Sequence, residues 1–227
     1  STGTIGNALV HQYRRNHPDA EIHTFSRSSK PDFPHHHTID YHDETSIRDA
    51  AQNAFSDAPF DVVVVATGIL HDDTNLWPEK SLRDLSMEKF QRAFAANTIF
   101  PAIAAKHFLP LLHRDKDVRF AALSARVGSI SDNHLGGWYA YRAFKAALNM
   151  IIKNCAIETA RRHKRAIIVG LHPGTVNSAL SKPFQSNVQD GKLFDPTFAA
   201  QSLINVLNRL TPAHSGKCFA WDGQEIP

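Results

Sequence analysis

The sequence predicts an α/β fold in which a doubly wound, Rossmann-like parallel sheet lies between two layers of helices. Short apolar segments alternate with helical ones along the whole chain. Residues 61–66 contain four consecutive valines, which indicates a strand buried on both faces. A chain of 227 residues with 42% hydrophobic content can bury one substantial core. We therefore expect a single domain over residues 1–227.

The first half of the chain opens with a helix. Ile5, Leu9 and Tyr13 recur at every fourth position, and the helix should end before Pro18. The elements expected next are a strand at 22–25, a weak strand at 37–40, a helix at 45–55 and the strand at 61–66. A glycine-rich turn precedes the first helix, and such a turn needs a strand ahead of it to aim it. We therefore expect that the first strand is missing here and that the natural protein carries residues before Ser1.

The second half continues the alternation. Ser86 can cap a long helix in which Phe90, Phe94, Asn97 and Pro101 share a face. The elements expected after it are a strand at 118–123, a helix at 141–160, a strand at 166–171, a helix at 196–210 and a strand at 217–221.

Composition narrows the class of protein. The two cysteines, Cys155 and Cys218, cannot form a disulfide framework, and no apolar run is long enough to cross a bilayer, so we expect a cytoplasmic protein. The net charge is +3, but the basic residues do not alternate with aromatic ones in a stripe, which disfavours nucleic-acid binding. His35, His36 and His37 are adjacent, and adjacent side chains cannot all face one ion. We therefore interpret them as a polar loop and expect no metal.

The turn at residues 1–6 runs directly into the first helix. Its sequence, Ser-Thr-Gly-Thr-Ile-Gly, places backbone N–H groups and the positive end of a helix dipole where a pyrophosphate could lie. A tight turn without a ligand would have the same local pattern. The residues expected to bind a cofactor here are Thr2, Gly3, Thr4, Ile5 and Gly6.

Tyr141 and Lys145 lie four residues apart on a predicted helix, so their side chains share one face. A free phenol has a pKa of about 10, and a neighbouring ammonium would stabilise the phenolate and lower that pKa. The pair therefore indicates a general acid/base, although an amphipathic surface helix can carry the same spacing.

These motifs occur in the order and spacing of one known family. Alongside the turn and Tyr141 to Lys145, the chain has Ala66-Thr67-Gly68 after a strand, Asn97 in the next helix and Pro173-Gly174 after another strand. The whole chain resembles the short-chain dehydrogenases/reductases. The stretches 124–133, 136–142, 172–176 and 221–223 are similar to the C-factor and sniffer-like carbonyl reductase branch in particular.

The resemblance implies a role for each matching position. Tyr141 would be the proton donor in carbonyl reduction, Lys145 would lower the pKa of Tyr141 and hold the nicotinamide ribose, and Asn97 would hold a water in a proton relay. The expected cofactor contacts are Ala66, Thr67 and Gly68 along the adenine ribose, Asp40 at the adenine, Pro173, Gly174 and Val176 at the nicotinamide, and Ser178 near the pyrophosphate.

The choice of cofactor depends on the end of the second predicted strand. An acidic residue there would accept from a ribose 2′-hydroxyl and repel a 2′-phosphate, but this sequence has Ser26 followed by Arg27. Arg27 can pair with a phosphate through its forked donors, or it can stack over the adenine or face solvent. We therefore expect NADP in preference to NAD.

Three positions depart from the family pattern. Thr4 replaces a glycine of the turn, and Phe144 stands where a small serine is usual, so its bulk could crowd the nicotinamide or narrow the pocket. The hydroxyl that binds the substrate carbonyl is either Ser124, at the end of a strand, or Ser129, twelve residues before Tyr141. We favour Ser124, although the family's usual position falls on Ala125.

The expected function is reduction of an aldehyde or ketone, or oxidation of the alcohol, by hydride transfer with NADP(H). Residues 178–194 would form a lid over the substrate, and Leu70, His71, Leu135, Trp138 and Phe184 are expected pocket walls. The alternative is a non-catalytic nucleotide-binding signalling protein of the C-factor type on the same fold. The resemblance also implies a homodimer or homotetramer, built through the helices that carry Asn97 and Tyr141.

Overall fold

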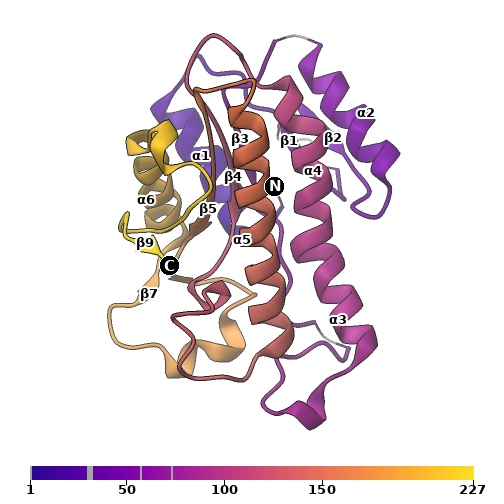
Figure 1. Ribbon diagram of the computed structural model, residues 1–227, viewed down its shortest axis with the longest axis vertical. Coiled ribbons are helices and arrows are strands. Elements are labelled where there is room, and N and C mark those ends of the chain that lie inside the picture. The colour runs from indigo at the N-terminus through magenta and orange to yellow at the C-terminus, as the bar shows by residue number, and fades with distance from the viewer. Residues whose placement is uncertain (1, 30–32, 57, 73) are drawn as a thin grey trace.

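The computed structural model describes residues 2–29, 33–56, 58–72 and 74–227 and has the expected α/β architecture (Figure 1). Its α-helices are α1 (Thr4–Asn16), α2 (Glu44–Phe55), α3 (Met87–Phe94), α4 (Phe100–Phe108), α5 (Tyr139–Ala160) and α6 (Pro196–Arg209). Its strands are β1 (Thr24–Ser26), β2 (His36–Thr38), β3 (Val62–Val65), β4 (Val118–Leu123), β5 (Ala166–His172), β6 (Thr175–Val176), β7 (Leu193–Phe194), β8 (Cys218–Ala220) and β9 (Glu225–Ile226).

The central sheet has the order β3-β4-β5-β8-β9, and only β9 runs antiparallel to its neighbour. The register pairs Val62 with Arg119 between β3 and β4, and Val118 with Ala166 between β4 and β5. Strands β1 and β2 form a separate parallel pair, and β6 and β7 form another. The predicted parallel sheet is thus confirmed, whereas the short strands β6, β7 and β9 were not expected because two residues carry no detectable alternation.

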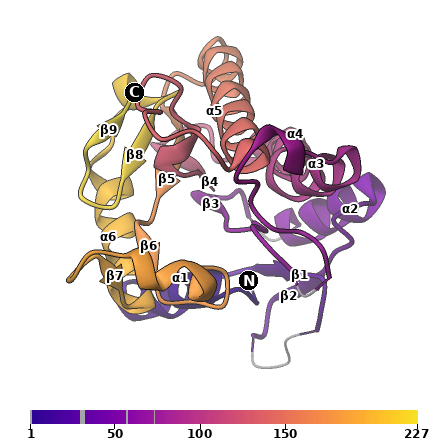
Figure 2. The same ribbon diagram turned by 90° about the horizontal axis from the view of Figure 1, so that it is seen from below.

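Helices cover both faces of the sheet (Figure 2). Phe120 of β4 and Ile168 of β5 face α2, α4 and α5, where they pack with residues such as Leu148. The alternate positions, Ala121 and Ile167 among them, face α6 and the start of α1. This period-two alternation on two buried faces gives the three-layer α/β/α arrangement. None of the helices in the described residues is long and apolar enough to span a membrane.

The helix predicted after Ser86 is not continuous. Helix α3 is followed by a π-helical turn, Ala95–Ile99, before α4 begins. Pro101 has no N–H to donate to the carbonyl of Asn97, and Phe100 N–H instead reaches back to Ala95. Asn97 also donates from Nδ2 to the carbonyl of Ala93, at 2.8 Å, which competes with the regular ladder. π-Turns of this kind are frequent at functional sites.

Candidate active site

The predicted site residues gather at one edge of the sheet. Strands β3, β4 and β5 are parallel, so the segments that follow them emerge together at their carboxyl ends. Ala66–Gly68 follow β3, Ser124 follows β4, and Pro173 with Gly174 follow β5. The structure thus brings three separate motifs to the same end of the sheet.

Helix α1 begins at this edge without a capping side chain. Gly3 is its N-cap, no side chain hydrogen-bonds there, and the first turn contains no acidic residue. The carbonyl of Gly3 accepts from the N–H of Asn7 at 2.9 Å, which is the first hydrogen bond of the helix. The N–H groups of Thr4, Ile5 and Gly6 lie in the first turn, where no helical carbonyl precedes them by four residues. They are therefore suited to bind an anion. Thr2 is exposed beside them, while Ser1 lies outside the described residues.

Asn97 connects the π-turn to the loop after β3. Its side chain is 1% exposed. Its Oδ1 accepts from the N–H of Ile69, and its Nδ2 donates to the Ile69 carbonyl, both at 3.0 Å. Because Ile69 directly follows Thr67 and Gly68, its two hydrogen bonds to Asn97 also hold these residues in position. This contact is a positioning role that the sequence did not reveal, because Asn97 and Ile69 are 28 residues apart.

Lys145 is buried behind the end of β4. Its side chain is 4% exposed, and its Nζ donates to the carbonyl of Leu123 at 2.6 Å. Burial lowers the pKa of Lys145 to about 8, because the charged form loses its hydration. Gly128 lies directly against this residue, where an added Cβ would be 2.8 Å from the Lys145 Cβ. Only glycine permits this approach.

The Tyr141 ring lies edge-on against two aromatic neighbours, Trp138 at 5.7 Å and Phe144 at 4.9 Å between ring centroids. Burial raises the pKa of Tyr141 to about 12. This direction is opposite to the one expected from the Tyr141–Lys145 spacing. The reason is physical: the phenolate is desolvated, and the ammonium expected to stabilise it is bound to the carbonyl of Leu123.

Phe144 lies in the contact between α3 and α5 and is 1% exposed. Its ring meets Phe94 edge-on at 6.3 Å, and its backbone carbonyl accepts from Thr98 Oγ1 at 2.9 Å. It also lines the space beside Tyr141. The departure from a small residue at this position therefore narrows that space.

The two candidate serines are both occupied by other partners. Ser124 donates from Oγ to Oδ1 of Asn149 at 2.6 Å and is 4% exposed. Ser129 is 3% exposed and its Oγ accepts from the N–H of Asp132 at 3.2 Å. Within the described residues, neither hydroxyl is hydrogen-bonded to Tyr141. The choice between them stays a prediction.

The segment after β5 is tightly packed. Gly174 has φ +74°, and a Cβ there would lie 2.5 Å from Cε2 of Phe194, so both conformation and space require glycine. Pro173 is buried beside it, and Val176 is 4% exposed. Ser178 begins the expected lid and is hydrogen-bonded with Ser181.

Arg27 and Asp40 follow the neighbouring strands β1 and β2 and are both exposed. The guanidinium of Arg27 lies 5.4 Å from the ring centroid of Tyr41. Ser26 is fully buried and donates from Oγ to the carbonyl of Ser28 at 2.7 Å. The end of β1 therefore carries the positive charge of Arg27, and Ser26 stands where an acidic residue would repel a 2′-phosphate. Asp40 Oδ1 accepts from the N–H of His42 at 2.9 Å.

The lid segment lies near the amino end of α5 (Figure 1). It includes the short 3-10 helix Lys182–Asn187, from which Phe184 contacts Trp138 at 5.1 Å and His71 at 5.8 Å. The cavity beside Tyr141 has a volume of only about 10 Å³, enough for about one water. The expected wall residue Leu70 lines this cavity. Leu135, which is 91% exposed, and Phe184 are not among the residues that line it.

Two residues of this region were missed from the sequence. Trp77 stacks on His71 at 5.2 Å and lines the cavity beside Tyr141. Glu79 is 3% exposed, and its Oε2 accepts from the N–H of Ala140 at 3.1 Å, which fixes the start of α5. Neither lies in a periodic segment. The sequence Trp77-Pro78, an aromatic residue before a proline in a loop, was the local feature that could have pointed to this region.

His172 is the last residue of β5 and precedes the Pro173-Gly174 motif. Its Nδ1 is buried without a hydrogen-bond partner in the described residues. Burial lowers the pKa of His172 to about 4, and the positive charges of Arg126 and Lys145 act in the same direction. The imidazole is therefore neutral at physiological pH.

Comparison with known proteins agrees with this arrangement of sheet, turn and helix. The chain belongs to the short-chain dehydrogenase/reductase family of NAD(P)-dependent oxidoreductases, because a family profile described as Enoyl-(Acyl carrier protein) reductase matches residues 5–207. The C-signal protein of Myxococcus xanthus is 32% identical over 169 residues, which covers 74% of this chain and 93% of that protein.

Solved structures share the fold. The NADPH-bound carbonyl reductase from chicken fatty liver superimposes with a TM-score of 0.83 at 21% identity, covering 98% of this chain and 94% of that chain. The carbonyl reductase Sniffer of D. melanogaster gives a TM-score of 0.78 at 20% identity, covering 98% and 93%. The predicted family is thus confirmed, with a C-signal protein among its relatives, and the sniffer carbonyl reductase shares the fold.

Proposed function

We propose that this protein reduces an aldehyde or ketone with NADPH, and that Tyr141 supplies the proton. The observation that carries the proposal is the placement of Tyr141 and Lys145 one turn apart on α5, with Lys145 Nζ at the carbonyl end of β4. The family fixes the class of cofactor as a nicotinamide dinucleotide. The substrate class and the preference for NADPH are our inferences.

The residues present suit a dinucleotide. The uncapped start of α1 offers N–H groups to a pyrophosphate, and the space where Gly3 would carry a Cβ is open. Arg27 would meet a 2′-phosphate, Asp40 the adenine, and Ala66 to Gly68 the adenine ribose. Pro173, Gly174, Val176 and Ser178 would lie along the nicotinamide half. When bound, the nicotinamide supplies the hydride.

The chain's own groups must then bind the carbonyl and deliver a proton. Tyr141, with a pKa of about 12, holds its proton at neutral pH and can donate it to a developing alkoxide. Lys145 would hold the ribose and favour the phenolate after transfer, once its ammonium leaves the Leu123 carbonyl. Asn97 would position the loop after β3, and Ser124 or Ser129 would donate to the carbonyl oxygen.

A second candidate function has specific support. Ser124 is bound to Asn149, Ala125 has no hydroxyl, and the C-signal protein is a relative at 32% identity. These observations favour a nucleotide-binding signalling protein without turnover. The two candidates differ in one measurable property, which is carbonyl-dependent oxidation of the cofactor.

The test is oxidation of NADPH and of NADH by the full-length protein against a panel of aldehydes and ketones. We expect turnover that is faster with NADPH, and Tyr141→Phe should lower kcat by about a hundredfold or more while NADPH binding is kept. Tyr139→Phe, which removes a phenol hydroxyl two residues earlier on α5, is the matched control and should leave kcat unchanged. Cofactor binding without turnover on any substrate would instead establish the second candidate.

A further inference from the structure

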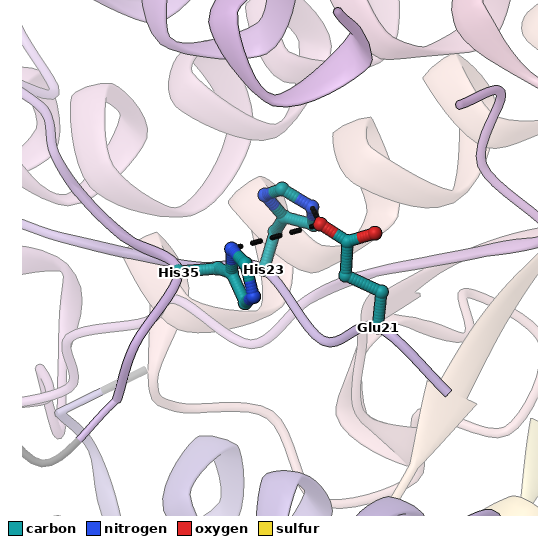
Figure 3. A group of neighbouring side chains, drawn as sticks. All are labelled: Glu21, His23 and His35. Carbon is teal, nitrogen blue, oxygen red and sulfur yellow. Dashed lines mark hydrogen bonds and ion pairs between the residues drawn. The ribbon is translucent and has the colours of Figure 1, made fainter. Parts of the chain in front are cut away.

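Three side chains with metal-ligating atoms converge at the amino ends of β1 and β2, and Figure 3 shows them facing one another. Glu21 and His23 come from the segment before β1, and His35 precedes β2. Glu21 Oε1 lies 2.9 Å from Nε2 of His23 and 3.6 Å from Nδ1 of His35. All three ligand atoms lie within 4.8 Å of one another.

We propose that Glu21, His23 and His35 bind a divalent transition metal, and that this metal is Zn²⁺. Ligand atoms bound to Zn²⁺ at about 2.0–2.2 Å in tetrahedral geometry lie roughly 3.3–3.5 Å apart. The two distances from Glu21 Oε1, 2.9 and 3.6 Å, lie on either side of that value. The two imidazole nitrogens lie within 4.8 Å of each other, so a rotation of the half-exposed His35 and Glu21 side chains would bring all three ligand atoms around one ion.

The chemistry of the donors selects the ion. Two imidazoles and one carboxylate are suited to Zn²⁺, whereas Mg²⁺ and Ca²⁺ prefer oxygen ligands throughout. The side chains of His35 and Glu21 are 46% and 43% exposed, so an ion can enter from solvent and water can complete its coordination. The site thus has three protein ligands and at least one position open to water.

His23 is held in the orientation that a ligand needs. Its side chain is 9% exposed and meets the Phe60 ring edge-on at 6.1 Å. Its Nδ1 lies 3.0 Å from Nε2 of His37, so the Nδ1–H tautomer of His23 donates a hydrogen bond to His37. A hydrogen bond from the second ring nitrogen fixes the tautomer of metal-bound histidines in general. Here it would leave the lone pair of His23 Nε2 directed at the proposed ion.

The backbone also holds the ligands in place. The N–H of Thr24 donates to the carbonyl of His35 at 2.9 Å, and the parallel register pairs Thr24 with His36. The residues just ahead, His23 and His35, are therefore brought side by side, with ring centroids 5.1 Å apart. Adjacent side chains at 35–37 cannot all face one ion, and from those residues alone no metal is expected. The parallel partner segment, however, places Glu21 and His23 beside His35.

The proposed site is separate from the candidate active site. Arg27 and Asp40 follow the carboxyl ends of β1 and β2, whereas the three ligands precede the amino ends of the same strands. A metal there would link the two segments and stabilise the fold. It would supply no group to the reaction.

The experiment uses full-length protein without a histidine tag, stripped with a chelator and titrated calorimetrically with ZnCl₂ alone. We expect one Zn²⁺ per chain with a Kd in the micromolar range or tighter, and no binding of MgCl₂ under the same conditions. His35→Ala and Glu21→Gln should each weaken binding at least tenfold, while His134→Ala, at an exposed position outside the cluster, should leave Kd unchanged.

Thermal unfolding with and without ZnCl₂ supplies a second measurement. Zn²⁺ should raise the Tm of the wild type and of His134→Ala, and should not raise that of His35→Ala or Glu21→Gln. Both variants replace half-exposed side chains, and their Tm in chelator is compared with the wild type to check folding. No Zn²⁺ binding by the wild type, or equal affinity in all variants, would overturn the proposal.

Discussion

Arg27 is the single side chain on which the proposed cofactor preference depends. It is exposed at the end of β1, its guanidinium lies 5.4 Å from the Tyr41 ring centroid, and the residue before it is the buried Ser26. A guanidinium can form two parallel hydrogen bonds with a phosphate, and charge-assisted bonds are about twice as strong as neutral ones.

Replacing Arg27 should therefore discriminate between the two dinucleotides. We expect Arg27→Ala to weaken NADPH binding by about tenfold or more, as loss of a charged hydrogen bond predicts, with little change for NADH. Fluorescence titration of both cofactors measures this. Arg48→Ala, which removes an arginine paired with Asp49 on α2, is the control. Equal losses for NADPH and NADH would show stacking on the adenine instead.

Residues of the candidate active site could be predicted from the sequence where a short motif, with fixed spacing along one helix, identified them. Tyr141 and Lys145 were found because their helical spacing fixes a shared face. The partners of these residues could not be found, because they depend on tertiary contacts. Lys145 donates to Leu123, 22 residues away, and Ser124 donates to Asn149, 25 residues away. The predicted lowering of the Tyr141 pKa was wrong for the same reason, because burial, which depends on tertiary packing, raises that pKa.

At the scale of elements, long periodic segments were predicted well and short or interrupted ones were not. The strand Val118–Leu123 has the expected bounds, and α5 begins two residues before the expected start. The helix after Ser86 was expected to be continuous because Phe90, Phe94, Asn97 and Pro101 share a helical face. The π-turn arises from the missing N–H of Pro101 and the side-chain bond of Asn97, which periodicity does not detect.

The 3-10 helix Lys182–Asn187 should control which carbonyl compounds reach Tyr141. Phe184→Ala removes the ring that contacts Trp138 and His71 and that packs against Trp77, one of the residues lining the cavity beside Tyr141. We expect kcat/KM for a bulky aromatic ketone to rise about tenfold relative to a small aldehyde, because pocket size discriminates by that order. The KM for NADPH should not change.

Steady-state kinetics with the two carbonyl compounds give this ratio. Phe55→Ala, which removes a half-exposed ring at the end of α2, is the matched control and should leave the ratio as in the wild type. An unchanged ratio in Phe184→Ala would mean that this segment does not cover the substrate.

At the scale of the whole molecule, His172 should couple stability to pH. Its pKa is about 4 in the folded protein and about 6.5 in an unfolded chain, so between these values the unfolded state binds one more proton. The free energy of unfolding should therefore fall as pH is lowered from about 6.5 to about 4, by about 3 kcal/mol.

Urea unfolding at several pH values measures this dependence. In His172→Gln the fall over that interval should be smaller by the contribution of this imidazole, whatever the variant's absolute stability. His134→Ala, at an exposed position, should keep the wild-type slope. If His172→Gln also kept the wild-type slope, His172 would not be the buried neutral group.

The expected homodimer or homotetramer stays a prediction. Apolar side chains that such an assembly could cover are exposed on the π-turn and on α5: Ile99 is 56% exposed, Met150 61% and Ile157 49%. The sequence predicted which helices would be involved only through the family resemblance. Exposure of an apolar face depends on the packing of the rest of the chain.

The small volume beside Tyr141 has a consequence for the timing of catalysis. A cavity that holds about one water has no room for a ketone, so the Trp77 ring that lines it, and the Phe184 ring packed against Trp77, would have to move before the proposed substrate reached the phenol. Each turnover of the proposed reaction would then begin and end with opening and closing of the proposed lid, residues 178–194, on the microsecond to millisecond timescale typical of such loops. The opening rate of this segment would then limit kcat. The closed segment would keep bulk water from the phenol between turnovers.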